Sequence, residues 1–334
     1  MRSVIILGAG ASAPFGVPTL CHLFQDKHSR LYLLKNPSFK EILNKVFWNP
    51  RGLDIDSSHL GLTLEEILTV IRDYEKHTFN AAPNISITNV ANFRKHLYAL
   101  SKHAVFDGKS STGMHLNPLL TFTKTKFEHT TWGSFNWDCL FEASFYYHSS
   151  NNPMCRGNPT VAVSLHNWRY KHNSSLFLKL HGGINWWFEN DVLNYLPYGP
   201  GGELDAHWTS YERNKVEGHP VLLEPSFYKY DDPVYNLLKP QWDRFVKELL
   251  LANVIIIIGY SLPEADPESR RALTIAFQGN PSAKFIVFDN NEWVRKRYER
   301  LYGTIRLRCI ETPYHAVEDI GSLINETLLQ IDVN

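Results

Sequence analysis

Several groups suited to chemistry directly follow apolar runs in this sequence, and the first is the segment GAGASA at residues 8–13. It comes after the β-branched run at residues 3–7 and matches the pattern G-x-G-x-x-A. In that pattern the first glycine permits a tight turn, the second lets the backbone approach a pyrophosphate, and the small last residue lets a helix pack on a sheet. We interpret the segment as a nucleotide-binding loop, with an ordinary strand-to-helix turn as the alternative. The residues expected to contact the nucleotide are Gly8, Ala9, Gly10 and Ser12.

The same loop lacks one feature of dehydrogenases. Such an enzyme has a second strand that ends in Asp or Glu about twenty residues further on. Here residues 20–34 have helical spacing instead. We therefore expect a nucleotide that is bound in a different manner.

A second polar group is the sequence NWD at residues 136–138, which follows the predicted strand at residues 130–135. Asn136 offers both a donor and an acceptor, and the Asp138 carboxylate could orient an amide or stabilise a developing positive charge. An N-x-D turn is, however, more often a helix cap, because both residue types favour that position. The residues alone leave both interpretations open.

The third candidate is His181, which the apolar run at residues 176–180 delivers into a Gly-Gly turn. Histidine titrates near neutral pH, so His181 could act as a general base toward a ribose hydroxyl or water. The chain has 15 histidines, and any one of them is more often a surface or hydrogen-bonded core residue. Its place at the end of a strand sets His181 above the others.

Two later apolar runs also end in small or polar residues. Gly259 and Ser261 follow the first of these runs, and Asp289 and Asn290 follow the second. Because the carboxyl ends of parallel strands meet at the edge where ligands bind, we expect a phosphate near the first pair and a ribose or adenine near the second. Each group alone could be a plain turn.

These runs alternate with helical patterns, which predicts an α/β fold with a Rossmann-like parallel sheet and helices on both faces. Strands are expected at residues 3–7, 130–135, 176–180, 254–258, 284–288 and 305–310. Helices are expected beyond Pro18 and at residues 240–251, 269–277, 292–302 and 316–331.

Residues 32–117 show helical spacing and almost no strand character. We therefore divide the chain into a Rossmann-like domain at residues 1–31 and 118–334, and a helical insertion at residues 32–117. The stretch at residues 186–220 is rich in glycine, asparagine, tyrosine and tryptophan. That composition predicts a loop or a small lid.

Composition sets limits on partners and location. The 334 residues include 34 Lys and Arg against 34 Asp and Glu, so no overall field attracts nucleic acid or an acidic membrane. The most apolar stretch is too short to cross a bilayer, and no signal-peptide pattern is present. We expect a soluble, cytoplasmic protein. The four cysteines are far apart and form no C-x-x-C pair, so we expect neither a zinc site nor a disulfide framework.

Taken together, GAGAS at residues 8–12, NWD at 136–138, KLHG at 179–182 and GYS at 259–261 resemble the sirtuin-like superfamily in order and rough spacing. The resemblance covers the sheet-forming segments and leaves the helical insertion uncovered. It implies a Rossmann domain that binds NAD through the glycine-serine loop.

The resemblance also implies roles for single residues. Asn136 and Asp138 would line the nicotinamide pocket, and His181 would act at the ribose. Gly259 and Ser261 would contact the phosphate and ribose region, and Asn290 the adenosine. NAD would be the substrate.

Departures from the family pattern point to one of its branches. Deacylating sirtuins carry a four-cysteine zinc ribbon, and this chain has no cysteine pair that could begin one. They also carry an Asp-Phe-Arg segment, and this chain has Thr19, Leu20 and Cys21 in its place. The sequence HGGINWW from His181 onward resembles the divergent prokaryotic branch, which is similar to antiphage effectors that destroy NAD. For such an effector we expect a homo-oligomer whose activity is controlled by a partner such as a ring-forming ATPase.

The sequence therefore predicts an NAD glycohydrolase, or NAD⁺ nucleosidase, that releases nicotinamide and ADP-ribose in antiphage defence by abortive infection. One alternative keeps the same pocket and transfers the ribosyl group, by ADP-ribosylation, cyclisation or deacylation. Another is a sensor that binds NAD or ADP-ribose without cleaving it. Product identification separates the three.

Overall fold

The computed structural model describes part of the chain, and all structural statements below concern that part. The described residues are 1–15, 17, 23, 31–32, 35–37, 68–69, 94–99, 101–102, 117–142, 144, 175–190, 192–195, 218–224, 229–311 and 320–332. The helix expected beyond Pro18 lies outside them.

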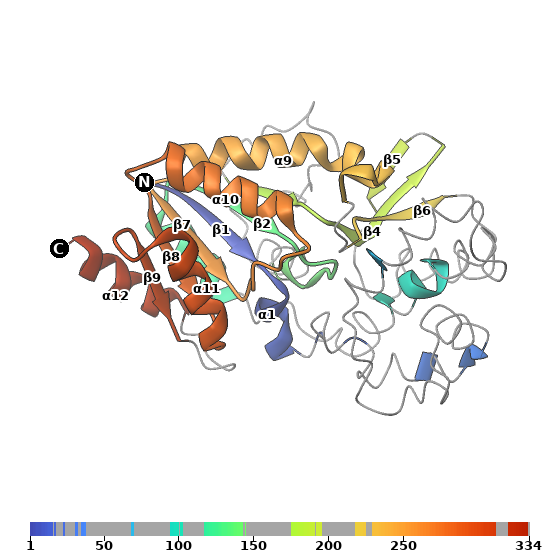
Figure 1. The fold of residues 1–334 in the computed structure, drawn as a ribbon, viewed down its shortest axis with the longest axis horizontal. Helices are drawn as coiled ribbons and strands as arrows, with labels where there is room; N and C mark the ends of the chain where they lie inside the picture. Colours follow the sequence, from blue (N-terminus) through green and yellow to red (C-terminus); the bar gives the residue numbers. More distant parts are fainter. Residues whose placement is uncertain are drawn as a thin grey trace.

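The core is a six-stranded sheet with the strand order β3-β2-β1-β7-β8-β9 (Figure 1). All neighbouring strands in it are parallel. The strands are β1 (Arg2–Leu7), β2 (His129–Ser134), β3 (Ser175–Lys179), β7 (Val254–Ile258), β8 (Lys284–Phe288) and β9 (Leu307–Ile310). Among these six strands the chain order reverses beside β1, which is the topological switch point of a Rossmann-like fold. The predicted fold class is confirmed.

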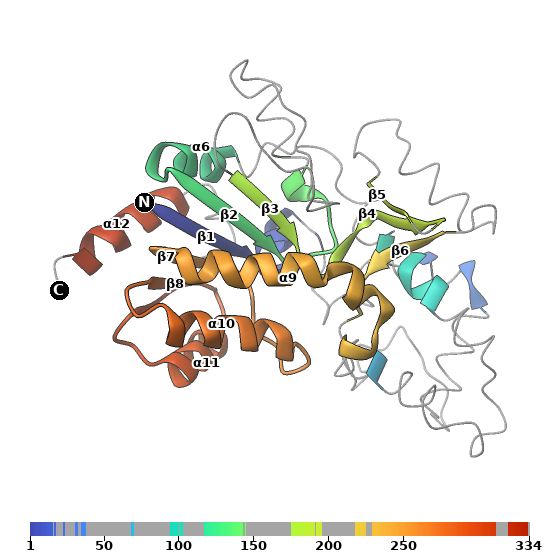
Figure 2. The ribbon, with the colours of Figure 1, turned by 90° about the horizontal axis from the view of Figure 1, so that it is seen from above.

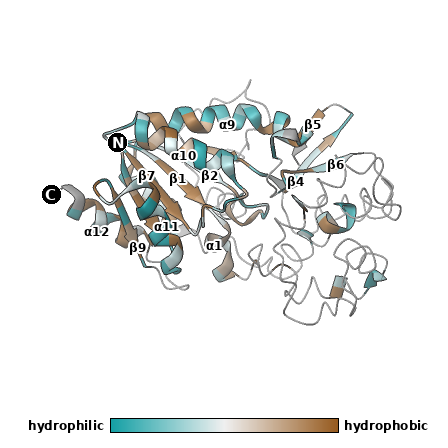
Figure 3. Cartoon of the chain, viewed as in Figure 1, coloured by the Kyte–Doolittle hydropathy of each residue, from teal (hydrophilic) through white to brown (hydrophobic). Residues whose placement is uncertain are grey.

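Helices cover both faces of this sheet (Figure 2). The covering helices are α6 (Asn117–Lys126), α9 (Pro233–Leu251), α10 (Pro267–Gly279), α11 (Glu292–Tyr302) and α12 (Ile320–Asp332). Alternate strand residues point to opposite faces, so Ile6 and Ile257 pack with α9, α10 and α11, whereas Ile5 and Ile256 pack with α6 and α12. Because both faces are buried, β7 is apolar throughout and β1 is apolar from Val4 onward, and both strands are largely brown in Figure 3. β2, with the sequence HTTWGS, is more polar.

The boundaries of the predicted elements match the structure closely, whereas helix α6 was not predicted. The expected helix at residues 240–251 begins at Pro233, because the Asp232 side chain accepts a hydrogen bond from the Val234 amide and a proline is accepted in the first turn. Pro240 then lies inside the helix, although a proline usually marks a helix end. The last strand begins at Leu307, two residues after the predicted start.

The stretch at residues 186–220 was predicted to be a loop or a small lid, and its described part is largely strand instead of loop. A role as a lid stays a prediction. β4 (Gly182–Glu189), β5 (Val192–Tyr195) and β6 (His219–Leu222) form a second sheet. Its order is β5-β4-β6, and both pairings are antiparallel. Trp186 in β4 is 0% exposed and belongs to the apolar cluster beneath α9, so burial of a large ring holds this sheet against the main one. Residues 196–217 lie outside the described part.

The predicted helical insertion is described only at a few positions. Residues 94–99 and 101–102 are helical. Arg94 binds the buried Glu224 carboxylate, with 2.7 Å between Nε and Oε1, and the Tyr98 hydroxyl donates to the same oxygen over 3.0 Å. Glu224 lies two residues beyond β6, so this helix is attached close to the second sheet. The domain division itself stays a prediction. None of the helices in the described part combines the length and apolar character needed to span a membrane.

Candidate functional site

The candidate residues all lie at the carboxyl edge of the six-stranded sheet, where hydrogen bonds link the loops that follow neighbouring strands. The Gly8 amide donates to the Ile258 carbonyl over 3.0 Å, and the Phe135 amide donates to the Leu7 carbonyl over 3.0 Å. The Leu180 amide likewise donates to Ser134 over 2.9 Å. The turns after β1, β2, β3 and β7 are therefore one connected unit.

The glycines of the first loop serve close backbone packing. The loop becomes α1 (Ala9–Ser12) at once, and the Gly10 amide donates to the Gly259 carbonyl over 2.8 Å. A Cβ on Gly8 would lie 2.5 Å from the Gly259 oxygen, and one on Gly10 would lie 2.8 Å from the Gly259 Cα. Gly259 itself has a φ of +59°, and its Cβ would lie 2.3 Å from the Ala11 nitrogen. All three glycines thus let the loops after β1 and β7 touch.

Asn136 is held by the glycine loop. Its Nδ2 donates to the Gly8 carbonyl over 2.9 Å and to the Ser12 hydroxyl over 3.0 Å. A carbonyl can only accept, so the amide has one orientation, with Oδ1 as the remaining acceptor. Oδ1 is buried, and no donor from the described residues reaches it. A buried acceptor without a donor is costly, so it is suited to a hydrogen-bonding group of a ligand.

Asp138 carries out the capping role that the sequence left open. Its Oδ1 accepts from the Leu140 amide over 3.0 Å, at the start of a helical turn at residues 140–142. Its backbone carbonyl accepts from Lys179 Nζ over 2.5 Å, and the same ammonium pairs with Glu142 Oε1 at 2.5 Å. Lys179 is fully buried. Burial lowers the pKa of Lys179, but the Glu142 carboxylate raises it further, so the net pKa lies above the ordinary value.

His181 lies in a buried charged cluster that sequence reasoning did not find. Its Nε2 is 3.1 Å from Asp266 Oδ2 and 3.3 Å from Lys229 Nζ. Lys229 Nζ is in turn 2.9 Å from Asp266 Oδ1. The side chains of Lys229 and Asp266 are each 1% exposed, and that of His181 is 10% exposed. The candidate base therefore has a carboxylate and an ammonium at one ring nitrogen.

The electrostatics of this cluster favour a neutral imidazole. Burial and the Lys229 ammonium lower the pKa of His181, and the Asp266 carboxylate acts against them without reversing the shift. Burial raises the pKa of Asp266, but Lys229 and His181 lower it more, so the net pKa lies well below the usual range. Asp266 is thus a carboxylate at neutral pH, and His181 is available as a base.

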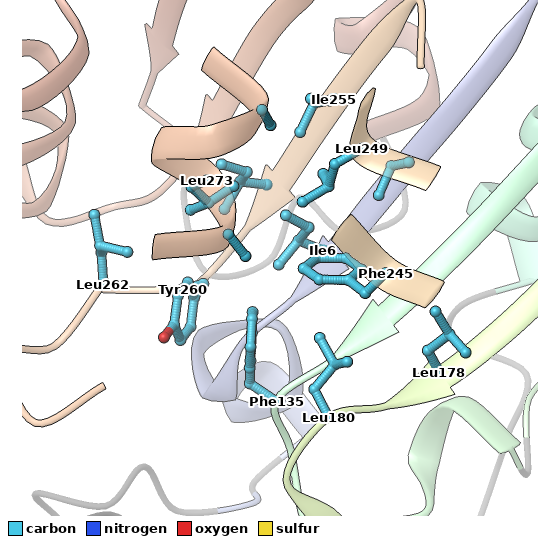
Figure 4. Packing of buried hydrophobic residues seen from close by; sticks show 14 of the residues in the cluster. Ile6, Phe135, Leu178, Leu180, Phe245, Leu249, Ile255, Tyr260, Leu262 and Leu273 are labelled. Atoms are coloured by element: carbon cyan, nitrogen blue, oxygen red, sulfur yellow. The ribbon is translucent and has the colours of Figure 1, made fainter. Parts of the chain in front are cut away.

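Asn136 and His181 are both linked to the turn that follows β2, Asn136 as a member of the turn and His181 through its contact with Phe135. The His181 and Phe135 ring centroids are 5.0 Å apart, and Phe135 directly precedes Asn136. The Phe135 ring stacks on Tyr260 with 4.2 Å between centroids, as Figure 4 shows. Phe135 therefore points into the apolar cluster while Asn136 reaches the glycine loop. The structure brings Asn136 together with Gly8 and Ser12, and His181 together with Phe135.

The loop after β7 is fixed from its outer side. Arg297 Nη1 donates to the Ser261 carbonyl over 2.9 Å, and Arg270 Nη2 donates to the Leu262 carbonyl over 2.9 Å. Leu262 has a φ of +52°, a conformation that is unfavourable for a branched side chain. Since the carbonyls are occupied by arginines, the loop keeps this shape. The Ser261 side chain is exposed at its tip.

Asn290 is exposed directly beyond β8, and Asp289 before it is buried. The Asp289 carboxylate accepts from the Asn291 amide over 2.8 Å, and burial raises its pKa. Both residues lie at the predicted edge, but the Asp289 carboxylate is used in a turn before α11. Their contact with a nucleotide stays a prediction.

Sequence reasoning missed Asp266 and Lys229. Asp266 precedes Pro267 and caps α10, so the Asp-Pro pair could have been read as a helix start but not as a partner of His181. Lys229 begins the short helix η4 (Lys229–Asp231) and has no sequence signal. In the described part, no group of three or more His, Cys, Asp or Glu side chains is arranged to hold a metal ion.

Comparisons with known proteins gave only structural matches. No protein-family model matches the chain. No curated protein matches it either. Among solved structures, it is similar to a Sir2 enzyme at 12% identity and a TM-score of 0.49, with 98% of this chain and 93% of that chain covered. It is also similar to a Sir2 homolog in complex with NAD, at 15% identity and a TM-score of 0.47, with 98% of this chain and 90% of that one covered.

Proposed function

We propose that this protein is an NAD glycohydrolase that cleaves NAD into nicotinamide and ADP-ribose at the carboxyl edge of the six-stranded sheet. The observation that carries the proposal is the Asn136 amide. Its Nδ2 is used by Gly8 and Ser12, and its buried Oδ1 has no donor among the described residues. A ribose hydroxyl, a carboxamide or a water molecule would supply that donor.

The proposed chemistry uses the three candidate residues at this edge of the sheet, Asn136, Asp138 and His181. In NAD the bond from the ribose C1′ to the pyridinium nitrogen breaks with its electron pair going to nitrogen, so neutral nicotinamide leaves and an oxocarbenium-like centre remains. Water then attacks C1′ and loses a proton. Asn136 Oδ1 would accept a hydrogen bond from that water, and the neutral His181 would take the proton at Nε2. Asp138 would offset part of the positive charge.

The position of the site supports a dinucleotide as ligand. Nucleotides bind Rossmann-like sheets at the carboxyl edge beside the topological switch point, and the loops after β1 and β7 meet there through Gly10 and Gly259. The backbone of α1, the Ser261 hydroxyl and Asn290 are the groups proposed for the phosphates and the adenosine.

The test is to incubate the purified chain with NAD and to identify the products by chromatography. Equal amounts of nicotinamide and free ADP-ribose support hydrolysis, whereas a cyclic or acylated product supports ribosyl transfer. Saturable NAD binding without nicotinamide release supports the sensor alternative. Asn136→Ala removes the side-chain amide on which the proposal rests. Asn325→Ala is a matched control on α12, where Asn325 Oδ1 accepts a hydrogen bond from Lys126 Nζ over 2.9 Å. The proposal fails if Asn136→Ala cleaves NAD as fast as Asn325→Ala.

The defence role, the homo-oligomer and the ATPase partner remain predictions from the sequence resemblance. An effector that destroyed NAD constantly would kill its own host, so we expect it to be inactive until it assembles or binds its partner. Activity per chain should then rise with protein concentration or on addition of the partner. A rate per chain that is high and constant over dilution would contradict control by assembly while leaving the hydrolysis itself intact.

A further inference from the structure

We propose that Asp266 and Lys229 are positioning residues that accommodate His181 in both of its protonation states, so that the imidazole can take up and release a proton while buried. The inference rests on the proposed function for the source of that proton. The arrangement of the three side chains is independent of it.

Three separate segments of the chain bring the cluster together. His181 lies in the turn between β3 and β4, Lys229 begins η4, and Asp266 caps α10. Their contacts are Nε2 to Oδ2 at 3.1 Å, Nε2 to Nζ at 3.3 Å and Nζ to Oδ1 at 2.9 Å. Nine-tenths or more of each side chain is buried. Burying three ionisable groups is costly unless each charge has a partner, and here the closed triangle of contacts supplies one for each.

The triangle provides a hydrogen-bond partner for Nε2 in either state. We assign the proton of the neutral ring to Nδ1, because Lys229 Nζ, which can only donate, is 3.3 Å from Nε2. In the neutral imidazole, Nε2 is then an acceptor, and Lys229 Nζ can donate to it. In the imidazolium, Nε2 carries a proton, and Asp266 Oδ2 can accept it. When Nε2 takes a proton from water, its hydrogen bond from Lys229 Nζ must break first, and the new N–H group then has Asp266 Oδ2 nearby as an acceptor.

Asp266 is held rigidly for this role. Its Oδ2 accepts from the Tyr260 hydroxyl over 2.5 Å, and its Oδ1 faces the Ser269 amide at 3.5 Å. Tyr260 is itself fixed, because its carbonyl accepts from the Tyr298 hydroxyl over 2.9 Å. The carboxylate therefore keeps its orientation whichever way the proton moves.

The charges around His181 predict the sign of each substitution. Lys229 from η4 and Asp266 from α10 are the charged groups that face the ring. The loop after β7 contributes Tyr260, and burial raises the pKa of its hydroxyl well above the usual value. The turn after β2 contributes the uncharged ring of Phe135, and α9 contributes that of Trp242. Asp266→Asn removes the group that favours the imidazolium, and Lys229→Gln removes a group that opposes it. The two variants should shift the titration of His181 in opposite directions.

The experiment follows the imidazole of His181 by NMR during a pH titration, with His181→Gln to assign the signal. We expect the midpoint to fall in Asp266→Asn and to rise in Lys229→Gln. The double variant removes both charges and should lie between the two. The exposed pair Lys239 and Asp243 on α9, with 2.8 Å between Nζ and Oδ2, supplies matched controls, because Lys239→Gln and Asp243→Asn should leave the midpoint unchanged.

The second readout is NAD cleavage as a function of pH, with each rate expressed relative to the maximum of its own variant. We compare the rates at the pH where the unsubstituted chain has half its maximal rate. At that pH, the rate of Asp266→Asn should exceed half of its own maximum, and the rate of Lys229→Gln should be below half of its own maximum. Loss of the orienting carboxylate should also lower kcat by about tenfold or more with little change in KM. Far-ultraviolet circular dichroism confirms folding, and Lys229→Gln alone tests the sign if Asp266→Asn does not fold.

The inference is overturned if both substitutions move the midpoint in the same direction, or if neither moves it beyond the two controls. The NMR titration requires no turnover. A chain that binds NAD without cleaving it, yet shows the opposite shifts, therefore contradicts the proposed function and keeps the positioning roles. A chain that cleaves NAD without those shifts supports the proposed function and contradicts the positioning roles of Asp266 and Lys229.

Discussion

The two edges of the main sheet each carry a buried carboxylate that pairs with a histidine and a basic side chain, but they differ in their access to water. At the amino edge, Glu248 Oε2 is 3.2 Å from Arg2 and 3.3 Å from His129, and its Oε1 is 2.6 Å from Arg244. The side chains of Arg2 and Arg244 are 42% and 40% exposed. At the carboxyl edge, Asp266 pairs with His181 and Lys229, and every partner is buried.

On the proposed function, this difference distinguishes a stabilising cluster at the amino edge from a functional cluster at the carboxyl edge. Arginines that reach water neutralise Glu248 while keeping much of their hydration, so the pairing costs little. Lys229 and Asp266 lose their hydration almost completely, and replacing such a cluster by apolar side chains is often neutral or stabilising. Retaining it suits a role in proton transfer, since strongly perturbed groups concentrate at functional sites.

The largest expected effect comes from replacing, one at a time, the two histidines that face these carboxylates. His181→Ala should lower the rate of NAD cleavage by about a hundredfold to ten-thousandfold, the range for a lost general base. His129→Ala removes the same residue type from the amino edge and should change the rate by less than about twofold. The rates are measured as nicotinamide release. Equal losses in both variants would erase the distinction between the edges.

The next effect concerns two glycines with positive φ. Gly259→Ala combines an unfavourable φ of +59° with a Cβ 2.3 Å from the Ala11 nitrogen, and we expect it to lower the free energy of unfolding by about 2–5 kcal/mol. Gly303 after α11 has a φ of +70° but nothing within 4 Å of its Cβ, so Gly303→Ala lacks the steric clash and should cost about 1–3 kcal/mol less than Gly259→Ala. Urea unfolding measures both. Similar losses would mean that the close loop contact at the carboxyl edge adds no constraint.

The smallest of these effects is the contribution of Glu248 to stability. Burial raises the pKa of Glu248, but the hydrogen bond from His129 and the charges of Arg244 and Arg2 lower it to about 2. A carboxyl with a depressed pKa stabilises the fold above its unfolded value and loses that contribution as pH falls toward about 2. Glu248→Gln should therefore lower the free energy of unfolding by about 1–3 kcal/mol near neutral pH.

The pH dependence is the check on this prediction. The difference in urea midpoint between the unsubstituted chain and Glu248→Gln should shrink as pH falls from about 6 toward about 2. NAD cleavage near neutral pH should persist in the variant. A stability difference that does not change with pH would show that Glu248 acts through packing instead of charge.

Local patterns were sufficient to predict the main sheet. The run VIIII of β7 and the run KFIVF of β8 are continuous and β-branched or aromatic, as doubly covered strands must be. The second sheet was missed because glycine, asparagine and tryptophan alternate in β4 without an apolar period. Its stability comes from the burial of Trp186, which depends on helix α9 far along the chain.

The candidate site divides in the same way. Asn136 and His181 could be named because each directly follows a strand, and strand ends are visible in the sequence. Their partners were not visible, because the contact between His181 and Asp266 spans elements that only the fold brings together. Lys229 lies in a three-residue helix with no pattern to mark it, so its role depends wholly on tertiary structure.

The most direct test of the central claim is an experimental structure of Asn136→Ala with NAD bound, since this variant should bind the substrate and cleave it slowly. We expect the nicotinamide riboside between position 136 and His181, with the pyrophosphate against the loop that begins at Gly8. A dinucleotide bound away from the carboxyl edge, or one that contacts neither residue, would contradict the account.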